Sequence, residues 1–437
     1  MADDRSYSAS FRSRQSRQPE YVVDLDRIEK NDRHTRKARI SLLGAPRNLL
    51  EKLAEALRRN YYLIELSIED GSIPMSAASA LGSALRHNQG LLFLRLRGSR
   101  LSSNAAVAIF EGLQRNNCVQ KLYLEGNSIQ PNAACTLAFT LSTNAVLKVL
   151  HLKDNPIGNQ GMRAIAEALR GNRCLEELCL QENGMTEGGI EPVGVMLSHN
   201  DHLKSLSIMN NNLTDRDIVG ITQEMRFNNS LEAWVLTGDP VSEAAARGIA
   251  TAIETAGPRG LRKLSLLGNQ LGDTGATLLA HALSSRNRVE EVRLMMNEIG
   301  DVGARALAQM LRENCQIREL DLTGNRITNV TPFLEALESN VHLKDLHLRG
   351  NSCGNSFADL QKLGMLLQQN WAGRRLLRNK DVPHGVYPRV LEKISNHPTM
   401  LYWFLTSRPD LVKDAPKDEM ETDYDTPMDY DTSMYAA

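Results

Sequence analysis

Apolar and polar residues alternate over short stretches that recur at a fixed spacing along most of the chain. The pattern LxxLxLxxNxI/L opens at eleven positions: Leu63, Leu91, Val119, Leu147, Leu175, Leu203, Leu231, Leu261, Val289, Ile317 and Leu343. Eight of the ten steps between them are 28 residues, and the exceptions are 30 before Leu261 and 26 before Leu343. A degenerate copy, ARISLLG, opens at Ala38. Such a period indicates a repeat protein in which one supersecondary unit stacks on the next.

Each repeat predicts a strand followed by a helix. The LxL segment alternates apolar and polar residues, which is typical of a strand with one buried face. The second half has apolar residues at helical spacing, as in GMRAIAEALRGN and GARALAQMLREN. Asparagine fills the ninth position in eight of eleven repeats: Asn127, Asn155, Asn183, Asn211, Asn269, Asn297, Asn325 and Asn351. Because a buried amide needs hydrogen-bond partners, we expect it to tie each coil to the backbone of its neighbour.

This pattern resembles the leucine-rich repeat family, specifically its ribonuclease-inhibitor-like class, over residues 38–372. The resemblance implies an α/β solenoid, a horseshoe with parallel strands on the concave face and helices on the convex face. Geometry agrees, because strands stack about 4.8 Å apart and helices about 8–10 Å apart, so the two layers must bend. The 30-residue step before Leu261 is expected to bulge as a loop while the next strand keeps its register.

The sequence divides into four segments. Residues 1–34 are rich in Ser, Arg and Gln and are expected to be disordered or to form an N-terminal cap, with residues 21–25 as an edge strand or part of the cap. The repeat array occupies 35–372. Residues 373–412 predict a C-terminal helical cap, similar to caps in leucine-rich repeat proteins of unicellular algae. Residues 413–437 hold eight Asp or Glu against two Lys and predict an acidic disordered tail.

Composition and charge narrow the function classes. The net charge of −1 argues against nucleic acid or an anionic membrane as partner. The N-terminus lacks an apolar signal segment, and no run of 18 apolar residues occurs. The six cysteines match neither a zinc site nor a disulfide framework. Free thiols then favour the cytoplasm, or the nucleus.

The chain has no GxxxxGK[ST], HExxH or CxxC, and its ten histidines are scattered. We therefore predict that it is not an enzyme, binds no cofactor or metal, and takes a protein partner rather than a small-molecule substrate. One alternative remains open. A repeat array followed by an acidic tail resembles the Ran GTPase-activating proteins, although their repeat lengths are less uniform and their functional residues have no clear match here.

Charges alternate along the second position of consecutive repeats. This column reads Lys148, Glu176, Lys204, Glu232, Arg262, Glu290 and Arg318. Neighbouring residues of parallel strands lie close together, so each charge would sit between two opposite ones. We interpret the column as a self-neutralising ladder that favours correct register; a charged recognition strip is the alternative.

The middle of the predicted concave face is apolar where water is expected. Five residues of the fifth, seventh and eighth positions form a patch: Met209, Val235, Leu267, Met295 and Met296. An exposed apolar patch usually marks a contact surface, and methionine suits an adaptable one. We predict that a partner binds here and that the chain is a scaffold or adaptor. Alternatively, a loop of the protein itself covers the patch, such as the insertion before Leu261.

A basic cluster is the second candidate surface. Six residues converge on three adjacent repeats, offset by Glu69 and Glu125: Arg95, Arg97, Lys121, Tyr123, His151 and Lys153. Such a cluster could hold an acidic or phosphorylated segment of a partner. It could equally be a solvated face.

Overall fold

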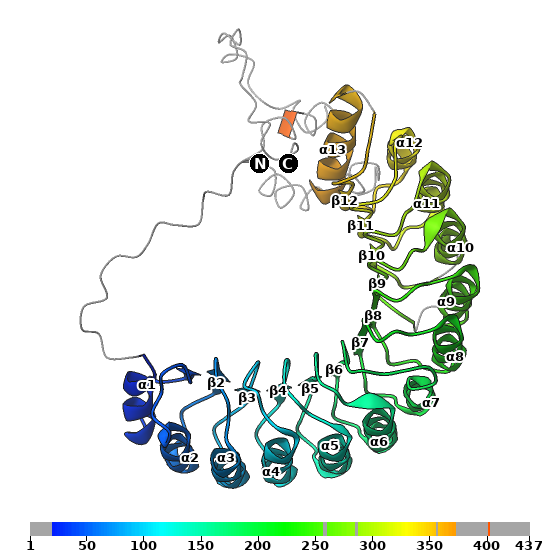
Figure 1. The fold of residues 1–437 in the computed structure, drawn as a ribbon. Coiled ribbons are helices and arrows are strands. Elements are labelled where there is room, and N and C mark those ends of the chain that lie inside the picture. The colour runs from blue at the N-terminus through cyan, green and yellow to red at the C-terminus, as the bar shows by residue number, and fades with distance from the viewer. Residues whose placement is uncertain (1–19, 257–259, 285–286, 355–356, 373–400, 403–437) are drawn as a thin grey trace, which may run out of the picture. The chain divides into compact units, whose positions relative to one another are not determined.

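The computed structural model describes residues 20–256, 260–284, 287–354, 357–372 and 401–402. Over these residues helices and strands alternate, from α1 (Glu20–Glu29) to α13 (Phe357–Ala372) (Figure 1). The chain divides into two compact units, Met1–Met196 and Leu197–Ala437, and each is treated by itself below.

The first unit holds six parallel strands among its described residues. They are β1 (Lys37–Ser41), β2 (Glu65–Glu69), β3 (Phe93–Arg95), β4 (Lys121–Tyr123), β5 (Val149–His151) and β6 (Glu177–Cys179). The helices between them are α2 (Leu49–Arg59), α3 (Met75–His87), α4 (Ser103–Gln114), α5 (Pro131–Thr143) and α6 (Gly158–Gly171). Helix α7 (Glu191–His199) crosses the boundary between the units.

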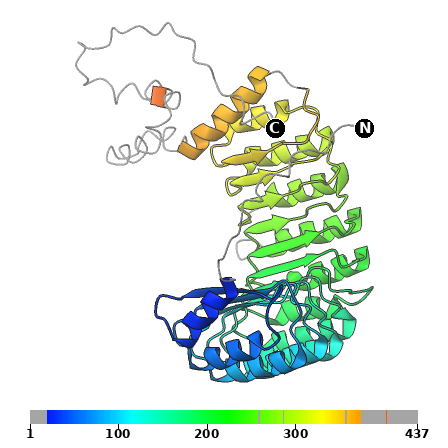
Figure 2. The same cartoon turned by 60° about the vertical axis from the view of Figure 1, so that its left-hand side comes forward.

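The described part of the second unit repeats the arrangement. Its strands are β7 (Ser205–Met209), β8 (Ala233–Thr237), β9 (Lys263–Ser265), β10 (Glu291–Arg293), β11 (Glu319–Asp321) and β12 (Asp345–His347). Its other helices are α8 (Asp215–Met225), α9 (Glu243–Ala256), α10 (Gly272–Ser284), α11 (Asp301–Glu313) and α12 (Thr331–Ser339). Figure 2 shows these strands stacked side by side in sequence order.

Strand pairing follows the repeat period. Residues 28 apart are partners in most pairs, as in Leu66 with Leu94 and Leu94 with Leu122. The longer repeat keeps its register, because Trp234 pairs with Leu264. Its extra residues fall partly in 257–259, outside the described residues. The 26-residue repeat is shorter in its helix, because α12 has 9 residues against 13 in α11. The prediction of an α/β leucine-rich repeat solenoid is thus confirmed.

The asparagine at the ninth position joins adjacent coils, as predicted. The Nδ2 of Asn127 donates to the carbonyls of Leu96 (2.7 Å) and Leu124 (2.8 Å), and its Oδ1 accepts from the amide of Leu101 (2.9 Å). Each such amide therefore satisfies backbone groups of two repeats inside the core.

A second column of asparagines lies at the C-terminal ends of the helices, and sequence reasoning missed it. In Asn88, for example, Nδ2 donates to the carbonyls of Leu57 (2.7 Å) and Asn60 (2.9 Å), while Oδ1 accepts from the amide of Leu91 (2.8 Å). The same arrangement of amide contacts recurs at several helix ends, including Asn116, Asn144, Asn228, Asn314 and Asn340. This column links the end of each helix to the start of the next strand.

The N-terminal segment departs from one expectation. Residues 21–25 lie in α1 and do not form an edge strand. Leu25 and Ile28 are three residues apart and therefore lie on the same side of this helix. Ile28 is in the core at 1% exposure, and its carbonyl accepts a hydrogen bond from Asn60 Nδ2 (3.0 Å). The cap and tail predicted for 373–412 and 413–437 lie outside the described residues, except for Leu401 and Tyr402. No helix among the described residues is both long and apolar enough to cross a membrane.

Candidate partner-binding surfaces

Three side chains of the first unit stack across adjacent strands. Arg95, Tyr123 and His151 are register partners in β3, β4 and β5. The Arg95 guanidinium lies 4.1 Å from the Tyr123 ring centroid. The Tyr123 and His151 rings meet edge to face, with centroids 4.8 Å apart. The structure thus brings the predicted Arg95 and Tyr123 into direct contact, in a geometry typical of cation–π and aromatic pairs.

Carboxylates surround this stack. Arg95 Nε donates to Glu65 (2.9 Å), Arg97 lies 3.4 Å from Glu125, and the two ring nitrogens of His151 lie 3.4 Å from Glu125 and 2.8 Å from Glu177. Burial acts to lower the pKa of His151, but the hydrogen bonds to Glu125 and Glu177 outweigh it and raise the pKa above its usual 6.5. The two carboxylates therefore favour the protonated form of the imidazole.

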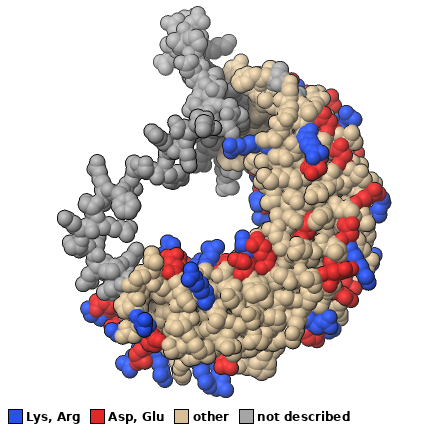
Figure 3. Space-filling model, in the orientation of Figure 1, with Lys and Arg blue, Asp and Glu red and all other residues tan. Residues whose placement is uncertain are grey.

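Positive charges of this cluster are therefore paired with carboxylates of the same unit. Figure 3 shows cationic and acidic side chains next to one another on this side of the unit. Of its six predicted members, Arg95, Arg97 and His151 make ion pairs, whereas Lys121 and Lys153 make none with the described residues. Sequence reasoning missed Glu65 and Glu177 as partners, although each follows the opening leucine of its repeat by two residues.

The second-position ladder forms only in part. Lys148 and Glu176 are 3.6 Å apart in the first unit. In the second unit, Arg318 instead donates to the carbonyl of His342 (3.2 Å). No ion pair joins Glu232, Arg262 and Glu290 to described residues, so the ladder prediction is wrong there. The reason is that exposed charged ends gain little from pairing and stay hydrated.

The apolar patch lies on the strand side of the second unit. Met209 belongs to β7 and Val235 to β8, while Leu267 and Met295 lie two residues after the ends of β9 and β10. These four side chains are half-buried and Met296 is exposed. Their neighbours take the core side at 1% exposure or less: Leu206, Ile208, Leu264, Leu266, Val292 and Leu294. The predicted outward orientation of the patch is confirmed.

Met296 is the unusual member of the patch. Its φ of 53° lies in the left-handed region, where a bulky side chain is strained, and it is 61% exposed. Glycine occupies the same position in the flanking repeats, at Gly268 and Gly324. A Cβ added to Gly324 would lie 3.1 Å from Met296 Cγ, so the methionine lies over that glycine. A strained residue that leaves its apolar surface in water is not explained by core packing.

Charges beside the patch are paired with one another. Lys263 lies 2.7 Å from Glu291, and Arg293 lies 3.0 Å from Glu319 and 3.8 Å from Glu291. This side of the unit therefore combines exposed apolar area with charges that already have partners.

A family model agrees with the repeat period. A leucine-rich repeat family model matches residues 143–166, 199–221, 259–280, 289–308 and 313–330. The chain is a leucine-rich repeat protein. No curated protein matches it significantly. Among solved structures, it is similar to the tropomodulin C-terminal domain of Caenorhabditis elegans, at 13% identity and a TM-score of 0.28, over 42% of this chain and 93% of that one. Another is actin-binding site 2 of leiomodin-1, at 13% identity and a TM-score of 0.26, over 55% and 91% of the two chains.

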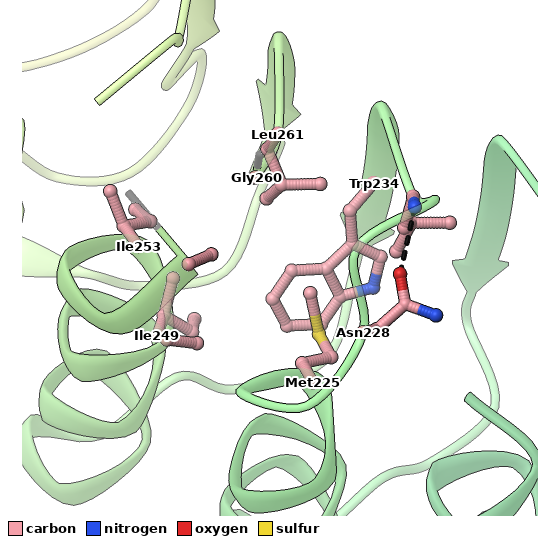
Figure 4. Close-up of a pocket in the computed structure, with 10 residues that line it drawn as sticks. Met225, Asn228, Trp234, Ile249, Ile253, Gly260 and Leu261 are labelled. Carbon is pink, nitrogen blue, oxygen red and sulfur yellow. Dashed lines mark hydrogen bonds between the residues drawn. The ribbon is translucent and has the colours of Figure 1, made fainter. Parts of the chain in front are cut away.

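One small pocket of this leucine-rich repeat protein lies inside the second unit (Figure 4). Trp234 stands where most strands have leucine, and its indole ring is 1% exposed. The lining is otherwise mostly apolar, with small residues at Ala252, Ala256 and Gly260 that leave room for the ring. The Trp234 Nε1 has no hydrogen-bond partner. No acid, base or nucleophile lines this pocket, and the described residues hold no cluster that could bind a metal ion.

Proposed function

We propose that this leucine-rich repeat protein is a scaffold or adaptor that binds a protein partner through the apolar patch of its second unit. Met296 carries the proposal, because it combines a left-handed backbone with 61% exposure of an apolar side chain. A left-handed non-glycine residue costs about 1–3 kcal/mol. Burying a methionine against a partner contributes roughly 1.5–3 kcal/mol, which would offset that cost.

The neighbouring charges indicate the kind of partner. Glu291 pairs with both Lys263 and Arg293, so a charged partner residue would have to displace an existing contact. Apolar partner side chains would meet the patch without such a loss. We therefore propose a partner segment that presents apolar residues, with flexible methionines adapting to it.

Substitution of Met296 by glycine tests this proposal. Relief of backbone strain should exceed the entropic cost of glycine, so Met296→Gly should raise the free energy of unfolding by about 0.5–1 kcal/mol. The same substitution should weaken partner capture from native cell extract, quantified by mass spectrometry. Val302→Asp is the matched control, because Val302 is 60% exposed on α11, outside the patch. Unchanged recovery of every partner by Met296→Gly and by Leu267→Asp would contradict the proposal.

The alternatives from the sequence stay predictions. A GTPase activator should accelerate GTP hydrolysis by a small GTPase in trace amounts, whereas a scaffold acts stoichiometrically and changes no rate. An acidic or phosphorylated partner at the basic cluster would have to compete with Glu65 and Glu125 for Arg95 and Arg97. The proposed scaffold requires no cofactor, and we place it in the cytoplasm or nucleus, where free thiols persist.

A further inference from the structure

One edge of the first unit is basic. Five segments lead from the end of a helix to the next strand along this edge: residues 57–64, 85–92, 113–120, 141–148 and 169–176. Together they contain seven Arg or Lys residues and one acidic residue, Glu176, which lies 3.6 Å from Lys148. The edge therefore has a strong excess of positive charge, although the whole chain has a net charge of −1.

The helix dipole alone does not account for this excess. It favours cations near the C-terminus of every helix. In the second unit, however, the last turns of α9, α11 and α12 hold the acids Glu254, Glu313 and Glu338. The basic edge is therefore a feature of the first unit and not of the repeat as such.

Three arginines of this edge lie in a row at consecutive helix ends: Arg58, Arg86 and Arg115. Asn88 Nδ2 donates to the carbonyl of the residue before Arg58 (2.7 Å), and Asn116 Nδ2 to that of the residue before Arg86 (2.6 Å). Adjacent helix ends are thus in direct contact. Packed helices lie about 8–10 Å apart, which sets the spacing along this arginine row.

The arginine row is available to a ligand. Its three side chains are exposed and make no ion pair with any residue that the structure describes. Other cations of the edge already have partners, since Arg59 lies 3.0 Å from Glu55 and Arg170 lies 3.2 Å from Glu167. An anion could therefore bind the row without displacing an existing contact, unlike an anion at the cluster around Arg95.

Two exposed tyrosines lie at the N-terminal end of the row. Tyr61 is 60% exposed and Tyr62 is 38% exposed, and the Arg36 guanidinium lies 6.0 Å from the Tyr62 ring centroid. The four segments from 85–92 to 169–176 contain no Phe, Tyr or Trp. Single-stranded nucleic acid needs aromatic platforms for successive bases, so this distribution favours a peptide.

We propose that the arginine row binds an extended acidic segment of a protein partner. An extended chain rises about 3.3 Å per residue, so every third residue would meet the next arginine of the row. The planar guanidinium can bind a carboxylate through two parallel hydrogen bonds, which suits glutamate or aspartate at those positions. This surface is separate from the apolar patch of the second unit and does not depend on it.

A synthetic peptide tests the proposal with the full-length protein. The probe is a fluorescein-labelled peptide of repeated Glu-Ser-Gly triplets, and fluorescence anisotropy at low salt measures its dissociation constant. The combined substitutions Arg58→Gln, Arg86→Gln and Arg115→Gln should weaken binding by roughly tenfold or more, because three exposed ion pairs are lost together.

Arg100→Gln with Arg216→Gln and Arg305→Gln is the matched control, because these exposed arginines lie outside the row. It removes the same charge and should change the affinity by less than about twofold, since distant exposed charges are screened. Equal weakening by the two triple variants would show that binding follows overall charge, and would refute the proposal. Failure of the wild type to bind the peptide would refute it as well.

Two further probes test the spacing and the class of ligand. A peptide of the same composition with its glutamates contiguous should bind the wild type roughly threefold more weakly or worse, because its carboxylates cannot reach all three arginines. Oligothymidylate should also bind more weakly than the spaced peptide. Equal affinity for the two peptides would overturn the extended register. Tighter binding of oligothymidylate, lost in the row variant, would assign the row to nucleic acid instead.

Discussion

Asp239 occupies a position that asparagine fills in neighbouring repeats. It is 1% exposed, and its Oδ1 accepts from the amide of Leu213 (2.9 Å), as asparagine does elsewhere. Its Oδ2 takes the place of the amide nitrogen and has no partner. In the next repeat that nitrogen, from Asn269, donates to the carbonyl of Leu236 (2.9 Å). A carboxylate can make such a bond only when protonated, and burial raises the pKa of Asp239 above its ordinary 3.8.

Replacing Asp239 by asparagine should stabilise the protein at pH 7 by about 1–3 kcal/mol, because it supplies the missing donor. The folded state favours the protonated acid. The wild type should therefore lose stability as pH rises from the unfolded pKa near 3.8 through the raised folded pKa. Urea unfolding at pH 4 and pH 7 measures both effects, and Asn269→Asp, which creates the same mismatch, should destabilise at pH 7. Equal stability of Asp239→Asn and wild type at pH 7 would rule out a charged, unsatisfied Asp239.

His151 should respond to pH in the opposite direction from a buried histidine without carboxylate partners. Its pKa is raised in the folded state, so its contribution to stability is complete below the unfolded pKa near 6.5 and is lost as pH rises through the folded value. An NMR titration should give His151 a pKa above 6.5. In Glu125→Gln with Glu177→Gln that pKa should fall, because burial then acts without the carboxylates. A His151 pKa at or below 6.5 in the wild type would contradict the double ion pair.

At the scale of elements, acidic residues in the first turn of one helix bind the start of the next repeat. Asp273 Oδ1 accepts from the amides of Gly300 (2.7 Å) and Gly303 (2.8 Å) at the start of α11. Asp301 accepts from the amide of Thr328 (2.8 Å), and Asp215 from that of Ser242 (3.0 Å). These carboxylates accept hydrogen bonds from backbone amides at or just before the first turn of the helix in the next repeat. The sequence of their own helix gives no sign of this role.

Asp273→Ala should therefore destabilise α11 rather than its own helix α10. Loss of the acceptor leaves two amides unpaired and should cost about 1–2 kcal/mol. Asp273→Asn keeps an acceptor oxygen and should cost less than half as much. Thermal unfolding gives the overall loss, and amide exchange in residues 300–306 locates it. Faster exchange confined to 272–278 would show that Asp273 acts only within α10.

The sequence predicts strands better than side-chain contacts. The 28-residue period determines the strands and their register, and alternation within LxL is enough to place Leu267 and Met295 outward. Residues 21–25 were ambiguous because a short apolar run fits a strand or a helix. Ion pairs such as Arg95 with Glu65 run diagonally between strands, and long side chains can reach several partners. The left-handed backbone at Met296 falls at the eighth repeat position, where several repeats have glycine, a signal that sequence reasoning did not use.

At the scale of the whole molecule, each repeat contacts mainly the repeats beside it. Within each unit, the described helices contact mainly helices adjacent to them along the chain, as for α3 with α4 and α10 with α11. In such an array, stability is approximately a sum of repeat and nearest-neighbour terms. A defect in one repeat should therefore weaken its neighbours first, unlike a defect in a globular core.

A cavity in α4 tests this locality. Phe110 is fully buried, and Phe110→Ala should cost about 3–5 kcal/mol, because the surrounding helices cannot close the void. Amide exchange should accelerate most in α3, α4 and α5 and stay near wild type in β10 and β11 of the second unit. Phe139→Ala on α5, where Phe139 is 59% exposed, should change exchange little anywhere. Uniform acceleration from β1 to β12 in Phe110→Ala would mean that the repeats unfold as one cooperative body, because only global opening exposes distant amides equally.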